Sequence, residues 1–174
     1  TQEEFELMRN HECSKPVLEK VRDIFIFNCR CGLRYGDLKS LKVEDTKGAL
    51  VSIKQQKTSK KTNIHLTQIP LDLLKKYDHN LPMLSEQKLN QYLKELGKEI
   101  GLTTQVEYKG EYVPKYKALT THAAIKTFIT HCAERNVPAQ YVSEITGKSL
   151  TVINKHYLGV DKGMIKRELS RAFD

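Results

Sequence analysis

The chain has 174 residues, of which 39% are hydrophobic and 29% charged, as is typical of a globular domain that buries its own core without disulfides. No apolar run approaches the roughly 18 residues that a membrane span needs, which argues against a membrane protein. The formal net charge of +8 favours a polyanionic partner, and nucleic acid is the leading candidate.

The cysteines and the start of the chain favour a cytoplasmic protein. Cys29 and Cys31 are the only close pair among four cysteines, and they lack the C-x-x-C spacing of zinc and redox sites. We therefore expect reduced thiols. The first residues are acidic and polar, whereas a secretion signal would be basic and then apolar.

Helical periodicity accounts for most of the expected elements. Ser14 is the expected N-cap of a core helix that has Pro16 in its first turn. Two glycines, Gly32 and Gly36, then bracket Arg34 at a junction between helices. Further along, helices are expected over 36–45, 71–77, 85–100, 120–136, 138–146, 149–157 and 161–173.

Two segments are expected to form hairpins or ordered loops. Residues 50–54 and 62–69 alternate apolar and polar side chains on either side of a lysine-rich turn, which predicts a β-hairpin with Lys57 near its tip. Residues 103–117 interleave tyrosines and lysines around Gly110, a pattern that suits contact with a nucleic-acid backbone. The expected fold class is mixed α/β, mainly α-helical, with a small antiparallel β-sheet near one edge.

A tyrosine among basic residues stands near the end of the chain. Lys148, Lys155 and His156 would hold an anion beside the phenol of Tyr157. Glycines at 147 and 159 punctuate this segment and would let the tyrosine leave the helix surface. An ordinary amphipathic tyrosine, half packed and half wet, is the alternative interpretation.

Taken in order, these landmarks resemble the catalytic domain of the tyrosine recombinases, the phage and mobile-element integrase family. Arg34 lies in a segment that looks like the family's first-arginine box, Lys57 matches its catalytic lysine, and His122 fits its His-x-x-Arg box. Tyr157 follows Gly147 by ten residues, as the nucleophile does in this family. The two boxes read Cys31-Gly-Leu-Arg-Tyr-Gly-Asp-Leu-Lys-Ser-Leu41 and Thr121-His-Ala-Ala-Ile-Lys-Thr-Phe128.

The resemblance implies a reaction and the residues that perform it. Tyr157 would attack a DNA phosphodiester to give a 3′-phosphotyrosyl bond and a free 5′ hydroxyl, and a second strand's 5′ hydroxyl would reverse this step. Arg34 would hold the non-bridging oxygens, Lys57 would protonate the leaving 5′ oxygen, and His122 would assist proton transfer or bind the phosphate. No metal and no other cofactor is needed.

The resemblance also implies partners and a domain organisation. Residues 1–174 would form a single catalytic domain, and the family's N-terminal DNA-clamping domain is not recognisable in them. The domain would act on double-stranded DNA and assemble there as a tetramer through its last residues, 161–174. The lysines expected to contact the DNA backbone are Lys54, Lys60, Lys61, Lys126 and Lys155.

Two positions depart from the family pattern. Ile125 stands where the family has its second arginine, and Lys148 stands where it usually has histidine. Lys126 is adjacent to the missing arginine but points about 100° away around the helix. Lys148 stays a candidate catalytic residue because it supplies charge to a phosphate, although without the bidentate grip of arginine.

Three functions stay open at this point. The chain is either a site-specific recombinase, impaired or from a divergent branch, or an integrase-like DNA-binding protein without catalytic turnover. The third is a helix-turn-helix regulator, since residues 137–157 contain two short helices around a glycine turn. That last interpretation leaves the hairpin and the Arg34 segment unexplained.

Overall fold

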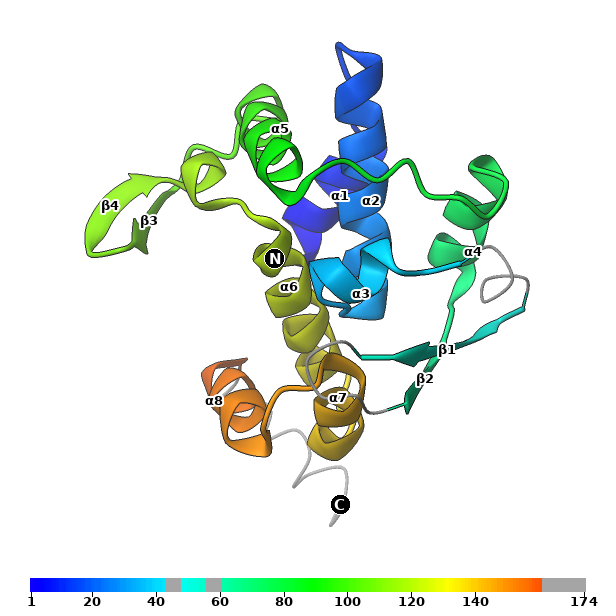
Figure 1. Cartoon of the computed structure of the whole chain (residues 1–174). Helices are drawn as coiled ribbons and strands as arrows, with labels where there is room; N and C mark the ends of the chain where they lie inside the picture. Colours follow the sequence, from blue (N-terminus) through cyan, green and yellow to red (C-terminus); the bar gives the residue numbers. More distant parts are fainter. Residues whose placement is uncertain (43–47, 56–60, 161–174) are drawn as a thin grey trace, which may run out of the picture.

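A computed structural model describes residues 1–42, 48–55 and 61–160 (Figure 1). Within these ranges the chain is mainly helical with two small antiparallel sheets, so the expected fold class is confirmed. The helices are α1 (Gln2–Asn10), α2 (Pro16–Cys31), α3 (Tyr35–Lys39), α4 (Gln68–Lys76), α5 (Glu86–Glu99), α6 (Thr121–Glu134), α7 (Ala139–Thr146) and α8 (Leu150–Val160), with a 3-10 helix over Lys115–Ala118. The strands are β1 (Leu50–Lys54), β2 (Lys61–His65), β3 (Gln105–Tyr108) and β4 (Glu111–Pro114).

Helix α2 forms the centre of the molecule and packs against α4, α5 and α6 (Figure 1). Its residues Leu18, Val21 and Phe27 are fully buried. Burial of a side chain of this size contributes roughly 1.5–3 kcal/mol, so these three residues stabilise the packing around α2. A second, smaller core joins α6, α7 and α8 around Ile129 and Ile153.

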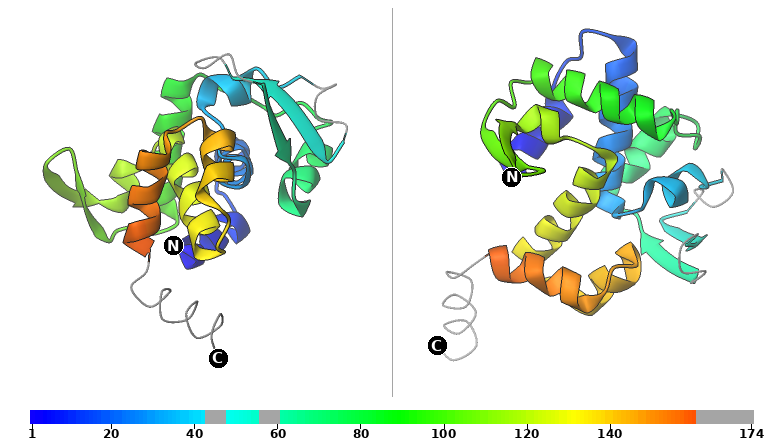
Figure 2. Two further views of the ribbon diagram at one scale, coloured as in Figure 1. Left: turned by 90° about the horizontal axis from the view of Figure 1, so that it is seen from below. Right: turned by 60° about the vertical axis from the view of Figure 1, so that its left-hand side comes forward.

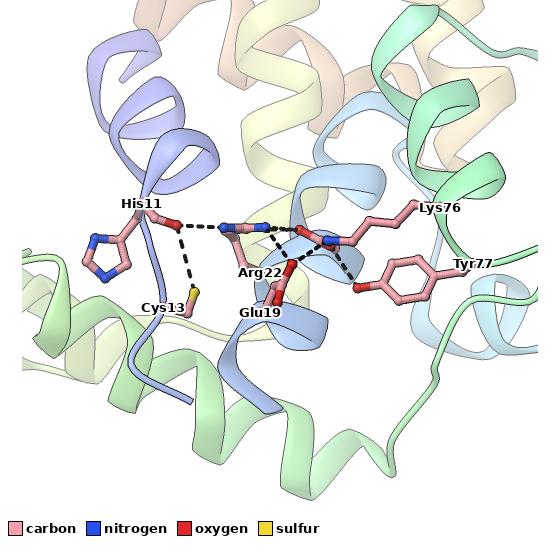
Figure 3. Close-up of polar contacts among 7 residues, drawn as sticks. His11, Cys13, Glu19, Arg22, Lys76 and Tyr77 are labelled. Carbon is pink, nitrogen blue, oxygen red and sulfur yellow. Dashed lines mark hydrogen bonds and ion pairs between the residues drawn. The ribbon is translucent and has the colours of Figure 1, made fainter. Parts of the chain in front are cut away.

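A charged network fixes α4 on α2 (Figure 3). Asp23 is only 2% exposed, and its carboxylate accepts hydrogen bonds from Lys76 at 2.6 Å and from the Tyr77 hydroxyl at 2.8 Å. Arg22 contacts the other carboxylate oxygen of Asp23 at 2.8 Å and donates to the carbonyl of His11 at 2.6 Å. The buried carboxylate is thus compensated on both sides, which a buried charge requires.

The expected β-hairpin is present, and a second one lies on the opposite side of the helical body (Figures 1 and 2). In the first hairpin Lys54 pairs with Lys61, and alternate side chains point inward, including Val51 and Ile53. The second hairpin pairs β3 with β4 around Gly110, as expected for residues 103–117.

Several boundaries differ from the sequence predictions. Helix α1 was not expected, although Thr1 and Glu4 form a capping box at its start. The side chain of Ser14 bonds to Glu99 rather than capping α2, whose N-cap is Lys15. Helix α3 ends at Lys39, earlier than predicted. The helix expected over 161–173 lies outside the described residues.

None of the helices in the described part of the chain combines the length and apolar character that crossing a membrane requires.

Candidate active site

The segment that carries Arg34 is fixed at the end of α2. Gly32 ends this helix with φ +67°, and a Cβ added there would lie 2.4 Å from the ring of Phe128, so only glycine fits. The side-chain amide of Asn28 then makes two bonds to Leu33: its nitrogen donates to the carbonyl and its oxygen accepts from the N–H, both at 2.9 Å. Arg34 therefore leaves α2 in a defined direction.

Arg34 reaches the turn between α7 and α8. Its Nη2 donates a hydrogen bond to the carbonyl oxygen of Gly147 at 2.7 Å. Its Nη1 is buried and has no hydrogen-bond partner among the described residues. Gly147 has φ +60°, and a Cβ there would lie 2.8 Å from Nη1 of Arg34. Glycine is therefore required both for the backbone conformation of the turn and for the close approach of the guanidinium.

His122 and Lys148 meet beside Arg34. Asn90 accepts the N–H of Thr121 at 2.7 Å and so satisfies one donor at the start of α6, which places His122 in the first turn. Lys148 Nζ lies 3.4 Å from Nε2 of His122, and an ammonium donor there requires the imidazole to carry its proton on Nδ1.

The surroundings of the His122 imidazole favour its neutral form. Desolvation lowers its pKa below the ordinary value, and the positive charges of Lys148, Lys126 and Arg34 lower it further. The ring is therefore able to accept a proton near neutral pH, and an anion bound between these cations would raise its pKa again.

One open pocket of about 550 Å³ unites these groups. Arg34, His122 and Lys148 line it together, so the structure brings three of the predicted catalytic residues to one place. Ile125 lines the same pocket but is 3% exposed and belongs to the second core, so its position supplies an apolar side chain where the family pattern has an arginine. Lys57 lies outside the described residues.

Tyr157 is held elsewhere. Helix α8 runs through this residue to Val160, so the expectation that the tyrosine leaves the helix surface is wrong for this structure. Its hydroxyl donates to the carbonyl of Val137 at 2.5 Å, and its ring packs against the second core. Burial raises the pKa of Tyr157 to about 12, with a further contribution from Cys132. Tyr157 does not line the pocket.

The neighbouring His156 does not line the pocket, but it lies within electrostatic reach of Lys126 and Lys148. Burial lowers its pKa, followed by the charges of Lys126 and Lys148. Consecutive helical residues project about 100° apart, so His156 and Tyr157 face different surroundings, and Tyr157 packs against the second core.

Four of the five lysines predicted to contact DNA lie in two groups. Lys54 and Lys61 are exposed and directly opposite each other at the end of the hairpin, where like charges repel unless a counter-charge lies between them. Lys126 is exposed one turn after His122 on α6, and Lys155 is exposed on α8. Lys60 lies outside the described residues.

Sequence reasoning missed Gln55, which is buried with 1% of its surface exposed. It follows β1 directly, and the alternation of Val51 and Ile53 extends to it, so a polar residue occupies an inward-facing position. That mismatch between side-chain type and position was the signal available in the sequence. Among the described residues, no group of three or more histidine, cysteine, aspartate or glutamate side chains is arranged to hold a metal ion.

Comparison with known families matches residues 1–163 to the phage integrase family, and the chain belongs to this family. No curated protein sequence matches the chain significantly.

Solved structures with the same fold are tyrosine recombinases. One is the Tn1549 transposon integrase in complex with transposon right-end DNA, to which the chain is 16% identical with a TM-score of 0.73. The matched region covers 100% of this chain and 65% of the integrase chain. The chain is 15% identical to XerA recombinase, with a TM-score of 0.68. The matched region covers 100% of this chain and 64% of the XerA chain. The chain is 18% identical to XerH site-specific recombinase bound to palindromic difH substrate, with a TM-score of 0.62. The matched region covers 97% of this chain and 50% of the XerH chain. The chain thus spans less than two thirds of the length of each of these proteins.

Proposed function

We propose that this chain cleaves and rejoins double-stranded DNA at specific sites through a 3′-phosphotyrosine intermediate. The observation that carries this proposal is the convergence of Arg34, His122 and Lys148 on one pocket, reached from three segments far apart in the sequence. Family membership and the DNA bound in two of the similar structures support it.

The pocket is suited to one phosphodiester group. Nη2 of Arg34 already donates a hydrogen bond to the carbonyl of Gly147. Nη1, which has no partner among the described residues, would donate to a non-bridging oxygen of the phosphate. Lys148 adds a second positive charge, and the neutral His122 accepts or donates a proton at the same phosphate. Electrostatic stabilisation by preorganised donors is typically the largest single contribution to such a reaction.

The proposed step exchanges one phosphoester bond for another. The Tyr157 hydroxyl passes its proton to the neutral imidazole of His122 as its oxygen bonds to phosphorus, and the bond from phosphorus to the 5′ oxygen breaks. Lys57 donates a proton to that departing oxygen. Rejoining runs the same step backwards from a 5′ hydroxyl, so the bond energy is kept and no external energy source is needed.

Cleavage by Tyr157 requires α8 to move. With its hydroxyl on the carbonyl of Val137, the tyrosine lies against the second core rather than in the pocket. A hydrogen bond of this kind stabilises by about 1 kcal/mol net, and repacking the ring adds to that cost. Contacts with DNA or with a neighbouring copy must therefore favour the moved state.

The basic lysines extend the contact beyond the pocket. Lys126 and Lys155 are exposed on the helices that border it, and Lys54 and Lys61 are exposed on the hairpin. Lys60 completes the set that we infer contacts the backbone. Assembly of four copies on duplex DNA in the cytoplasm of a bacterial or phage-derived system completes the proposal.

A second candidate function is DNA binding without turnover. The observation in its favour is Ile125, which places an apolar side chain at the wall of the pocket that Arg34 and Lys148 also line. Loss of one charge-stabilising donor slows a reaction by roughly 10²- to 10³-fold, which slows an enzyme without necessarily inactivating it. The helix-turn-helix interpretation gains no support, because the inward face of α8 packs against α6 and α7 through Ile153.

A covalent-trapping experiment separates these functions. The chain is incubated with a library of nicked duplexes of randomised sequence, from which DNA that stays attached to protein in detergent is recovered. We expect adducts from the wild type and none from Tyr157→Phe. Adducts that persist in Tyr157→Phe would overturn the assignment. If the wild type binds DNA without forming adducts, and only the double variant Ile125→Arg, Lys148→His forms them, the second candidate is correct.

A further inference from the structure

Thr121, the first residue of α6, is held against α5 by both of its polar groups. Its N–H donates to Oδ1 of Asn90 at 2.7 Å, and its hydroxyl donates to Oε1 of Glu86 at 2.9 Å. Glu86 and Asn90 lie four residues apart on α5, so they share one face of that helix. Thr121 is only 8% exposed, and a buried hydroxyl that loses its partner is costly.

These contacts stand in for a local cap of α6. The first N–H groups of a helix have no partner within it and are usually satisfied by the side chain at the N-cap. Thr120 occupies the N-cap of α6, but its side chain makes no capping bond. The first turn of α6 is therefore fixed from α5 by Asn90 and Glu86.

His122 takes its place in the pocket from this turn. It follows Thr121 directly and is exposed, so close packing does not fix its ring. Nε2 of the ring lies 3.4 Å from Nζ of Lys148, which belongs to the turn between α7 and α8. A catalytic group that is misplaced by about 1 Å costs roughly 10²-fold in rate. A contact that sets the position of the first turn of α6 thus has a consequence for the imidazole.

We propose that Glu86 is a positioning residue, which holds the first turn of α6 so that His122 lies opposite Lys148 in the pocket. Its carboxylate also lines the pocket, and it accepts the hydroxyl of Thr121. A carboxylate repels a phosphate group, so phosphate binding does not account for Glu86 at this wall. The catalytic part of this inference rests on the proposed function, whereas the placement of His122 does not depend on activity.

The first test measures the titration of His122 by proton NMR in the full chain without DNA. Lys148→Gln removes a positive charge near the imidazole, so it raises the pKa of His122. Thr121→Val removes the hydroxyl that binds Glu86 but changes neither the charge nor the shape of the side chain. We expect Lys148→Gln to raise the pKa less in the Thr121→Val background, because the ring no longer lies opposite the lysine. An equal rise in both backgrounds would overturn the inference.

Two variants are matched controls for this comparison. Thr127→Val removes another hydroxyl of α6, whose 2.9 Å bond to the carbonyl of Ala123 stays within the helix, and the response to Lys148→Gln should be that of the wild type. Thr121→Ser keeps the hydroxyl and should restore the wild-type response. A response that also shrinks in Thr127→Val would show general loosening of α6 and would overturn a specific role of Glu86.

A second pair of variants keeps the test decisive if Thr121→Val fails to fold by circular dichroism. Glu86 is exposed, so Glu86→Ala and Glu86→Gln leave the core intact. Both remove the same charge, but only glutamine keeps an oxygen that accepts the hydroxyl of Thr121. The response of His122 to Lys148→Gln should be smaller in Glu86→Ala than in Glu86→Gln. Equal responses in the two variants would contradict the proposed role.

The second test measures single-turnover adduct formation on a nicked duplex recovered by trapping, as a function of pH. The wild-type rate should rise as His122 loses its proton. We expect Thr121→Val to react roughly 10²-fold more slowly with unchanged DNA affinity, and the midpoint of its pH profile should move upward, because a displaced ring is better solvated and farther from Lys148. Thr121→Ser should restore both the rate and the midpoint.

The outcomes of the second test separate this inference from the proposed function. A slower rate with an unmoved midpoint would show a merely structural role of the contact between Glu86 and Thr121, and would overturn the catalytic part. A wild-type chain that forms no adduct on any duplex would overturn the proposed function. The titration would still decide whether Glu86 places His122 opposite Lys148.

Discussion

Arg34 and Tyr157 are each held by a backbone carbonyl, but the two carbonyls place them in different parts of the molecule. The carbonyl of Gly147 holds Arg34 at the pocket and leaves its buried Nη1 without a hydrogen-bond partner among the described residues. The carbonyl of Val137 holds the hydroxyl of Tyr157 against the second core. The groups that we propose bind a phosphate thus already lie together in the structure without DNA, whereas the proposed nucleophile must be released.

The difference follows from how each segment is built. Arg34 is fixed by short-range features, a glycine at the end of α2 and the amide of Asn28, which do not depend on a ligand. Tyr157 lies on a helix whose inward face is held by Ile153 and by one hydrogen bond. Release of Tyr157 therefore disturbs the second core, whereas Arg34 is anchored at the end of α2.

The largest expected effect comes from removing the guanidinium of Arg34, which we propose binds the phosphate. Arg34→Ala should lower the single-turnover rate of adduct formation by roughly 10²- to 10³-fold, because it removes a preorganised donor. Arg9→Ala, which removes the same charge from α1, is the control and should leave the rate unchanged. An unaltered rate in Arg34→Ala would mean that the pocket is not where cleavage occurs.

Next in size is the effect of filling the space between Arg34 and Gln55. Gly147→Ala should destabilise the fold by roughly 2–4 kcal/mol, because a Cβ meets both side chains and φ is +60°. Gly110→Ala isolates the backbone part, since φ is +85° there and nothing lies within 4 Å of the added Cβ. Urea unfolding of both variants measures the difference. Equal losses would mean that the turn is not packed as described.

A smaller effect is expected at the tyrosine. Tyr157→Phe should lower the free energy of unfolding by about 1 kcal/mol through loss of the bond to Val137. Because the folded-state pKa is raised from 10 to about 12, the hydroxyl's contribution is fully present below pH 10 and is lost as the pH rises to about 12.

Unfolding measured across that range checks this prediction. The difference between the wild type and Tyr157→Phe should shrink as the pH rises. Tyr112→Phe serves as the control, because Tyr112 is 77% exposed and its removal should change nothing. A constant difference across the range would indicate that the hydroxyl is not buried on Val137.

The smallest expected change is in the titration of His122. Lys148→Gln removes a positive charge near the imidazole, so the pKa of His122 should rise toward its ordinary value without reaching it, since desolvation is the larger cause of its depression. Proton NMR of the imidazole measures the shift. Lys39→Gln on α3 removes an equal charge and is the control. Identical titrations in all three proteins would mean that the charge of Lys148 does not affect the pKa of His122.

Local patterns predicted the elements well. The periodicity of residues 85–100 and the alternation in 50–54 come from side chains that face one core, and both elements form as expected. The start of α6 also lies where it was expected, with Thr120 at the N-cap. The partner of its first N–H could not be predicted, because Asn90, from α5, accepts the N–H of Thr121 and the side chain of Thr120 makes no capping bond.

The candidate site could be predicted by residue but not by arrangement. Family resemblance pointed to Arg34, His122 and Lys148, which do converge, although their catalytic roles stay predictions. The docking of Tyr157 on Val137 depends on how α8 packs against α6 and α7, which the spacing of residues in the sequence does not encode. Gln55 escaped notice because its partners are backbone carbonyls nearly 90 positions away.

Mass-spectrometric mapping of the covalent adduct tests most directly whether Tyr157 is the nucleophile. Trypsin cleaves after Lys155 and Lys162, so Tyr157 is the only tyrosine in its peptide. After nuclease digestion of the trapped DNA, we expect the remaining nucleotide mass on the peptide 156–162. Nucleotide mass on a peptide that contains another tyrosine, such as Tyr141, would contradict the proposed reaction.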